Sequence, residues 1–202
     1  FLSFLEAEGW QYLFGNSIPR ASRRDVLYVD DLEQFLRKAN PDLLAEEIRQ
    51  IIDTVRLAGG ESDFATLHKV YGWMVDGIQF VPQGKPARMV ALIDFENPEN
   101  NIFRVVNQFA VEYTNNGQTE TRRPDILLYV NGLPLCIIEL KNPADPTATI
   151  HSAWEQIYTR YWRDIPHLLH YCPLACISDG VKTRLGTVRT PYEHFYAWRR
   201  VE

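Results

Sequence analysis

Two apolar segments joined by Asn131-Gly132 constrain most strongly what this chain can fold into. The segment at 125–130, DILLYV, and the segment at 135–140, LCIIEL, each have the length of an ordinary β-strand. An Asn-Gly pair between two such runs is a strong hairpin signal, because these residues tolerate the positive φ angles that a tight turn needs. The sequence therefore predicts two adjacent antiparallel strands here.

Charged residues stand at the ends of these two strands. Asp125 opens the first strand, whereas Glu139 and Lys141 lie at the end of the second. The turn lies near the middle of the intervening stretch, so the two carboxylates can lie side by side. Glu139 and Lys141 are two residues apart and point to the same face of the sheet, while Ile138 and Leu140 point to the other.

Two carboxylates on adjacent strands, with a lysine beside them, form a donor set for a hard divalent cation. Mg²⁺ prefers a few carboxylate oxygens and several waters, so Asp125 and Glu139 are the predicted metal ligands. The backbone carbonyl of Leu140 is a further oxygen donor. The cation polarises a phosphoryl oxygen and lowers the pKa of its bound water. Lys141 is expected to orient that water or to stabilise the charge that develops on phosphate.

The alternative interpretation of these residues is a solvated sheet edge with a surface aspartate and a Glu–Lys pair. Taken alone, the three residues do not decide between the two interpretations. Pro124 precedes Asp125, which gives the order Pro-Asp…Glu-x-Lys across a hairpin. Two charges also end the otherwise apolar strand CIIELK, where a charge needs a partner. Both details favour the metal site.

The spacing of apolar residues changes along the chain from helical to extended and indicates an α/β fold. Helices are predicted over 1–14, 31–39, 42–57 (with Asp42 as N-cap), 62–75 and 147–163. Further strands are predicted over 88–95, 103–113, 174–178 and 181–188. This order favours a mixed central sheet flanked by helices, with an N-terminal helical region. The expected division is a helical part, 1–80, packed on a core, 81–202, in one compact domain.

Composition limits the function classes. The net charge of −5 argues against a protein that coats nucleic acid, although residues 121–202 carry 10 Lys/Arg against 8 Asp/Glu. No apolar run approaches the roughly 20 residues of a membrane helix. Cys136, Cys172 and Cys176 lack a Cys-x-x-Cys pattern, which favours buried thiols and a cytoplasmic location over disulfides or zinc. The start at Phe1, inside a predicted helix, suggests a piece of a longer chain.

The motif Pro124-Asp125…Glu139-Leu140-Lys141 resembles the signature of PD-(D/E)xK nucleases. The stretches at 92–112, 122–150 and 165–187 are similar to the N-terminal nuclease domain of the R subunit of type I restriction enzymes. The likeness runs from about residue 30 to the C-terminus. It implies a restriction-endonuclease-like core that cuts double-stranded DNA with Mg²⁺. It also implies fusion to an ATP-driven translocase and assembly with modification and specificity subunits. No GxxxxGK[ST] loop occurs, so ATP would bind outside these residues.

The resemblance also implies a Gln-x-x-x-Tyr motif on the helix after the Glu-x-Lys strand. Gln156 matches the glutamine, but Tyr161 is one position too far and Arg160 occupies the expected place. Either the helix contains an extra residue, as in a π-bulge, or the motif is used differently, with Tyr158 as the other candidate. Gln156 and Tyr161 are included among the expected catalytic residues. The simpler alternatives are a solvated glutamine and a core tyrosine.

Further site residues are expected on weaker grounds. Relatives often place an acidic residue on the first helix, where Glu6 is the nearest candidate, although a solvated glutamate is the favoured interpretation. A set of basic residues near the motif is expected to contact DNA phosphates, and each of them singly is more typical of a solvated charge. These residues are Arg122, Arg123, Arg160, Lys182 and Arg184.

Two alternative functions remain open on the sequence. One is a different nuclease of the same fold, such as a repair or recombination exonuclease. The other is a catalytically silent docking module that holds a translocase against its partners. The intact Asp125, Glu139 and Lys141 argue against the second alternative.

Overall fold

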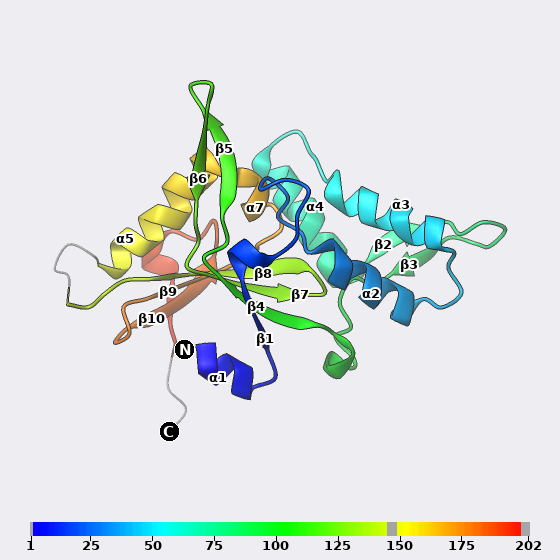
Figure 1. Ribbon diagram of the computed structural model, residues 1–202, viewed down its shortest axis with the longest axis horizontal. Helices are drawn as coiled ribbons and strands as arrows, with labels where there is room; N and C mark the ends of the chain where they lie inside the picture. The colour runs from blue at the N-terminus through cyan, green and yellow to red at the C-terminus, as the bar shows by residue number, and fades with distance from the viewer. Residues whose placement is uncertain (1, 145–148, 199–202) are drawn as a thin grey trace.

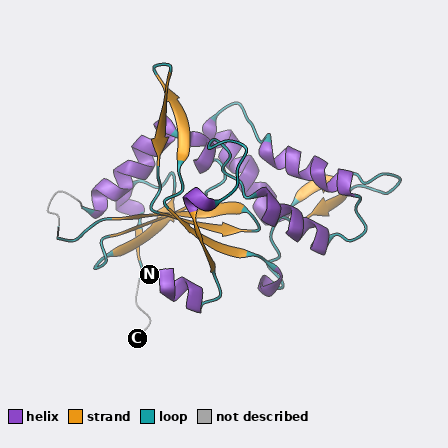
Figure 2. Ribbon diagram, viewed as in Figure 1, coloured by secondary structure: helices purple, strands orange, loops and turns teal. Residues whose placement is uncertain are grey.

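The computed structural model describes residues 2–144 and 149–198 and is built on a seven-stranded mixed sheet (Figures 1 and 2). The strand order is β1-β4-β7-β8-β9-β10-β11. The β1/β4 and β8/β9 pairs are parallel and the other pairs are antiparallel, which confirms the predicted mixed sheet. The strands are β1 (Gln11–Phe14), β4 (Phe103–Asn107), β7 (Ile126–Val130), β8 (Leu133–Leu140), β9 (Leu174–Ser178), β10 (Thr183–Thr187) and β11 (Tyr196–Ala197).

Helices cover both faces of this sheet. In Figure 1, α4, α5 and α7 lie on one side of the sheet and the short α1 lies on the other. One apolar cluster joins the N-terminal helices to the sheet, through side chains such as Leu32, Ile48, Val70 and Ile137. No helix among the described residues is long and apolar enough to cross a membrane. The helices are α1 (Leu2–Ala7), α2 (Val29–Ala39), α3 (Ala45–Arg56), α4 (Asp63–Asp76), α5 (Ile150–Glu155), α6 (Trp162–Asp164) and α7 (Pro166–Leu169).

The predicted helix over 1–14 is wrong in its second half. The helix α1 ends at Ala7, and Gly9 follows with φ of 91°, a conformation that favours glycine. The chain then enters β1, which pairs in parallel with β4. Trp10 packs on Phe103, with ring centroids 5.1 Å apart. The apolar residues of this segment therefore serve the edge of the sheet rather than one helical stripe.

The predicted strand over 103–113 is two strands. Gln108 adopts φ of 52° and breaks the segment after β4. The second half, β5 (Val111–Asn115), leaves the central sheet and pairs with β6 (Gln118–Arg122), a strand that the sequence reading missed. Between them, Asn116 and Gly117 form a tight turn, with φ of 48° and 79°. This hairpin projects from the body of the molecule (Figure 1).

The predicted strand over 88–95 is also shorter than expected. Only β3 (Arg88–Val90) is extended, and it pairs with β2 (Ile78–Phe80) in a separate two-stranded sheet. After β3 the Asp94 side chain accepts a hydrogen bond from the Asn97 amide at 2.9 Å. This local turn chemistry ends the extended conformation.

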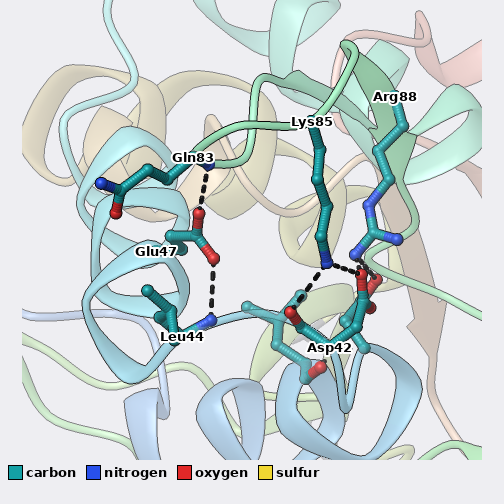
Figure 3. Close-up of polar contacts among 8 residues, drawn as sticks. Asp42, Leu44, Glu47, Gln83, Lys85 and Arg88 are labelled. Carbon is teal, nitrogen blue, oxygen red and sulfur yellow. Dashed lines mark hydrogen bonds and ion pairs between the residues drawn. The ribbon is translucent and has the colours of Figure 1, made fainter.

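Asp42 does not cap α3 as predicted. The helix begins at Ala45, and Glu47 accepts hydrogen bonds from the backbone amides of Leu44 and Gln83 at 2.7 and 2.6 Å. Asp42 instead pairs with Lys85 of the β2–β3 connection and with Arg88 at the start of β3, at 2.8 and 2.9 Å (Figure 3). Hydrogen bonds from these two cations lower the pKa of Asp42 to about 2. The two acids therefore attach the β2–β3 ribbon to α3.

Candidate active site

The β7–β8 hairpin carries the two carboxylates predicted to bind metal. Its turn is Asn131-Gly132, with φ of 50° and 77°, as the sequence predicted. A Cβ at Gly132 would clash with the carbonyl oxygen of Tyr28, so only glycine fits at this crossing. The Asn131 side chain is fully buried and accepts a hydrogen bond from the Ile102 amide at 2.8 Å. Turn preference and packing together fix the hairpin.

A β-bulge determines which residue lies opposite Asp125. The register shifts by one residue halfway along the hairpin, where Leu135 is the extra residue of β8. Beyond this bulge Asp125 faces Glu139, and the Asp125 amide lies 3.4 Å from Glu139 Oε1. Without the extra residue Asp125 would face Ile138, whose side chain belongs to the apolar cluster on the other face of the sheet.

The two carboxylates occupy different environments. Asp125 is half-buried, and its Oδ2 accepts a hydrogen bond from the Leu140 amide at 2.9 Å. Glu139 has an exposed fraction of 0%. Burial, and then the charge of Asp125, raise the pKa of Glu139 to about 8. The Tyr161 hydrogen bond and the Lys141 charge act in the opposite direction. A carboxylate buried in this way needs a proton or a cation as its partner.

The helix that follows β8 brings a tyrosine to the buried carboxylate. Between α5 and α6, η3 (Gln156–Tyr161) is a π-helical turn, whose i→i+5 hydrogen bonding accommodates an extra residue. Tyr161 donates to Glu139 Oε1 at 2.8 Å and accepts from Gln156 Nε2 at 2.7 Å. The π-bulge alternative is thus the one that the structure contains. Tyr158 instead stacks on Trp154, with ring centroids 4.6 Å apart.

Gln156 links the lysine to the buried carboxylate. Its Nε2 donates to Glu139 Oε2 at 2.7 Å, and its Oε1 accepts from Lys141 Nζ at 2.8 Å. The Lys141 amide donates to the Ser178 carbonyl at 2.8 Å, which fixes the lysine backbone against β9. One side-chain amide therefore holds the ammonium group and the carboxylate in a defined relation.

The oxygen donors at this place are two carboxylates and the neighbouring backbone carbonyls. Within residues 2–144 and 149–198, no group of three or more His, Cys, Asp or Glu side chains gathers as a cation site. Asp125 and Glu139 form a pair of carboxylates, which is smaller than such a group. The backbone carbonyl of Leu140, between Glu139 and Lys141 in the sequence, is a further oxygen donor. Glu6 is exposed on α1, and its side chain makes no hydrogen bond or ion pair with the described residues.

Two surface hollows border this cluster. The larger has a volume of about 650 Å³ and is lined by residues that include Asp125, Leu140, Lys141 and Gln108. Residues at the start of α1 close one of its sides. The other has a volume of about 430 Å³ and is lined by Thr121, Arg122, Arg123, Arg160, Gln156 and Tyr161. The second hollow is therefore basic and shares a wall with the residues that hold Glu139.

The five predicted DNA-contact residues divide into two groups. Arg122, Arg123 and Arg160 come together at the second hollow, although Arg122 is engaged in an ion pair with Asp164 at 2.7 Å. Lys182 and Arg184 do not line either hollow. Lys182 is exposed just before β10. The Arg184 guanidinium lies over the ring of Tyr192, 5.0 Å from its centroid.

Gln108 lies at the site in a conformation that the sequence did not predict. It was expected on a continuous strand, but its positive φ turns the chain beside Asp125. The Gln108 amide donates to the Asp125 carbonyl at 3.1 Å, and both residues line the larger hollow. The polar pair Asn107-Gln108, inside an otherwise apolar stretch, is the signal that marks this break.

The three cysteines lie apart from this chemistry. Cys136, Cys172 and Cys176 are free and buried, as predicted. Burial raises the pKa of the Cys176 thiol to about 11 and that of the Cys136 thiol further. Thiols of this kind are inert packing groups at neutral pH.

Comparison with known proteins identifies the family to which this chain is similar. A family profile described as "Type I restriction enzyme R protein N terminus" matches residues 1–194. The type I restriction enzyme HindI endonuclease subunit of Haemophilus influenzae is 33% identical over all of this chain. A Methanocaldococcus jannaschii protein, provisionally named as the type I restriction enzyme MjaIXP endonuclease subunit, is 33% identical over 96% of it. The chain spans about a fifth of the length of these relatives, 20% and 19%.

Proposed function

The chain belongs to the family of type I restriction enzyme R protein N-termini, and from that membership we propose that it is an Mg²⁺-dependent endonuclease domain. In this proposal it hydrolyses phosphodiester bonds of double-stranded DNA. The observation that carries the proposal is the pairing of Asp125 with the buried Glu139, beside a lysine that Gln156 tethers to the same carboxylate. This arrangement supports phosphoryl chemistry better than a solvated sheet edge, where Glu139 would be exposed.

The residues present fit a magnesium ion. Asp125 Oδ and Glu139 Oε atoms would hold it, with the Leu140 carbonyl as a further donor and water in the remaining positions. The elevated pKa of Glu139 supports this assignment, because a dication supplies the positive charge that the buried carboxylate lacks. When bound, the ion supplies Lewis-acid activation of the phosphate and of an attacking water.

The remaining side chains of the site would orient the attacking water and the metal-binding carboxylate, or stabilise charge on the phosphate. Lys141 lines the larger hollow, and its ammonium group would orient the nucleophilic water or stabilise the negative charge that develops on the phosphoryl oxygens. Gln156 keeps this ammonium group at a fixed place relative to Glu139. Tyr161 donates to Glu139 Oε1 and so restricts which carboxylate oxygen faces the ion. The catalytic set in this proposal is Asp125, Glu139 and Lys141, with Gln156 and Tyr161 as positioning residues.

Partners follow from the same proposal. Double-stranded DNA would approach the two hollows, with Arg123 and Arg160 on its phosphates and Arg122 supporting them. Lys182 and Arg184 remain candidates for more distant phosphate contacts. The full-length subunit would act in the cytoplasm, use ATP through other domains and assemble with modification and specificity subunits that select the target.

The decisive experiment is DNA cleavage by the assembled enzyme with Asp125→Ala or Lys141→Ala. We expect both variants to lose cutting while retaining ATP-dependent motion on DNA. Wild-type cutting by either variant would refute the proposed site. As a matched control, Lys69→Ala removes an exposed cation of α4 that lines neither hollow, and it should leave cutting intact. A Mn²⁺ soak of crystals provides a second measure, with density expected between Asp125 and Glu139.

A further inference from the structure

The hairpin of β5 and β6 has no role in the site as described so far. It forms its own two-stranded sheet, with Val111 paired to Arg122 and Asn115 to Gln118. In Figures 1 and 2 it rises away from the central sheet and ends in a free turn. Two-stranded ribbons are marginally stable in water on their own. Contacts at its base must therefore hold it in place.

Arginines supply these contacts. Arg20 donates to the Ala110 carbonyl at 2.8 Å, where the chain enters β5. Arg24 donates to Thr114 Oγ1 at 2.6 Å, one residue before the end of β5. Arg122, at the end of β6, is paired with Asp164 at 2.7 Å. The base of the ribbon is thus fixed to the body on both strands, and the ribbon is a positioned arm rather than a loose loop.

The outer part of the ribbon is neutral and rich in hydrogen-bonding groups. All residues from 114 to 119 are exposed, and their side chains are amides, hydroxyls and one glycine, TNNGQT. The acid Glu120 is engaged within the ribbon, accepting from Tyr113 and Asn115 at 2.5 and 2.7 Å. The acid Glu112 lies 3.6 Å from Arg23. Both acids thus have partners near the base of the arm, although the partners of Glu120 are neutral and its charge remains; the exposed tip at 114–119 carries no acid.

The base of the ribbon leads directly into the catalytic strand. β6 ends at Arg122, and Arg123 and Pro124 connect it to Asp125. The basic hollow lies at this junction. Arg123 and Arg160 are exposed there, and within the described ranges neither side chain makes an ion pair or hydrogen bond. The order in space is a neutral arm, then two available cations, then the paired carboxylates.

We propose that the β5–β6 ribbon lies in a groove of the DNA duplex, while Arg123 and Arg160 bind the phosphates at its base. This inference rests on the proposed nuclease function, because it assigns a substrate contact to the same site. The major groove, about 12 Å wide, admits a two-stranded ribbon. Five residues of extended chain span about 17 Å, enough to enter it. Neutral amides and hydroxyls there can bond base edges and sugar–phosphate oxygens of any sequence.

The test measures binding of a fluorescent, random-sequence duplex of about 30 base pairs at several salt concentrations. Ca²⁺ replaces Mg²⁺ to suppress cutting. The arm variant combines Asn116→Gly, Gln118→Ala and Thr119→Ala. Glycine tolerates the positive φ at 116, so the turn should persist. The matched control, Gln34→Ala with Gln50→Ala, removes exposed neutral amides from α2 and α3.

We expect the arm variant to bind about tenfold more weakly, with an unchanged slope of log affinity against log salt, because it loses neutral contacts. Arg123→Ala should instead lower that slope by about one. Gln118→Glu, a near-isosteric change that leaves the turn intact, should weaken binding further by repelling phosphate. The control should bind as the wild type does.

Wild-type binding by both the arm variant and Gln118→Glu would overturn the inference. If these variants instead impair assembly with the other restriction subunits, the ribbon is a protein-docking arm. A wild-type chain that binds no duplex at low salt would overturn the inference as well. Asp125→Ala distinguishes this failure from failure of the nuclease proposal, since that change should abolish cutting in Mg²⁺ but leave arm-dependent binding in place.

Discussion

The Gln156 side-chain amide is bound to the Glu139 carboxylate, with Nε2 2.7 Å from Oε2. The same amide accepts from Lys141, so it connects a buried anion to a cation that borders the larger hollow. In a metal site, groups that hold the ligands affect function without touching the substrate. Gln156 therefore holds Glu139 and Lys141 in position through hydrogen bonds and is not itself one of the proposed catalytic groups.

Gln156→Ala should reduce DNA cleavage by about 10- to 100-fold, the usual effect of removing a partner of a metal ligand. The Mg²⁺ concentration needed for half-maximal cutting should rise, because Glu139 loses one of its orienting donors. A purely structural role would lower the thermal midpoint and leave the Mg²⁺ dependence unchanged. Gln50→Ala on α3 is the control for loss of an exposed amide.

The pKa of Glu139 predicts how stability depends on pH in the absence of divalent metal. An ordinary glutamate titrates near 4.5, and the folded chain raises this value to about 8. Between these values the folded state binds more protons than the unfolded state, so the free energy of unfolding falls as pH rises. The loss should be on the order of a few kcal/mol.

Urea unfolding in EDTA at several pH values measures this slope. Glu139→Gln, which is neutral at every pH, should flatten it and should be more stable than the wild type near pH 8. Glu61→Gln, at an exposed position just before α4, is the control and should leave the slope as it is. A wild-type chain with equal stability at both ends of this range would contradict the prediction.

Metal binding should release protons for the same reason. A cation at Asp125 and Glu139 competes with the proton that Glu139 holds below about pH 8. The apparent Mg²⁺ affinity should therefore rise as the pH increases toward 8. Titration calorimetry in two buffers of different ionisation enthalpy measures the protons released per ion. Identical enthalpies in both buffers at neutral pH would show that Glu139 is already ionised without metal.

The parts of this site that the sequence predicted are those with a local cause. Asn131-Gly132 is itself a signal for a tight turn. The alternation of side chains along a strand then predicts that the charges at the two strand ends share one face of the sheet. The helices α2, α3 and α4 were predicted from apolar residues three or four positions apart, a spacing that depends only on nearby sequence. The π-turn was foreseen as one of two alternatives only because Gln156 and Tyr161 are separated by one residue too many.

The features that the sequence did not predict depend on distant contacts. The bulge at Leu135 was not predicted, although Pro134 directly before it lacks the backbone N–H that a regular ladder needs. The segment Gln11–Phe14 becomes a strand because β4 offers a free edge, although its own apolar pattern also suits a helix. The positive φ of Gln108 likewise depends on the fit of the chain beside Asp125.

Gly132 offers a test of how strongly the hairpin turn fixes the site. Gly132→Ala introduces a Cβ that clashes with the Tyr28 carbonyl and imposes a φ of 77° on an alanine. We expect a loss of about 3 kcal/mol or more in the free energy of unfolding, measured with urea. Gly117→Ala is the matched control, because its φ of 79° is similar but no atom lies within 4 Å of the added Cβ.

The control should cost only the backbone strain, about 1 kcal/mol. At temperatures where Gly132→Ala remains folded, its cleavage should also fall, because a displaced turn shifts β8 and moves Glu139 away from Asp125. Equal losses of stability in the two glycine variants would mean that the crossing with Tyr28 is not tight. In that case the register of Asp125 and Glu139 would depend on the bulge and on sheet packing rather than on the turn.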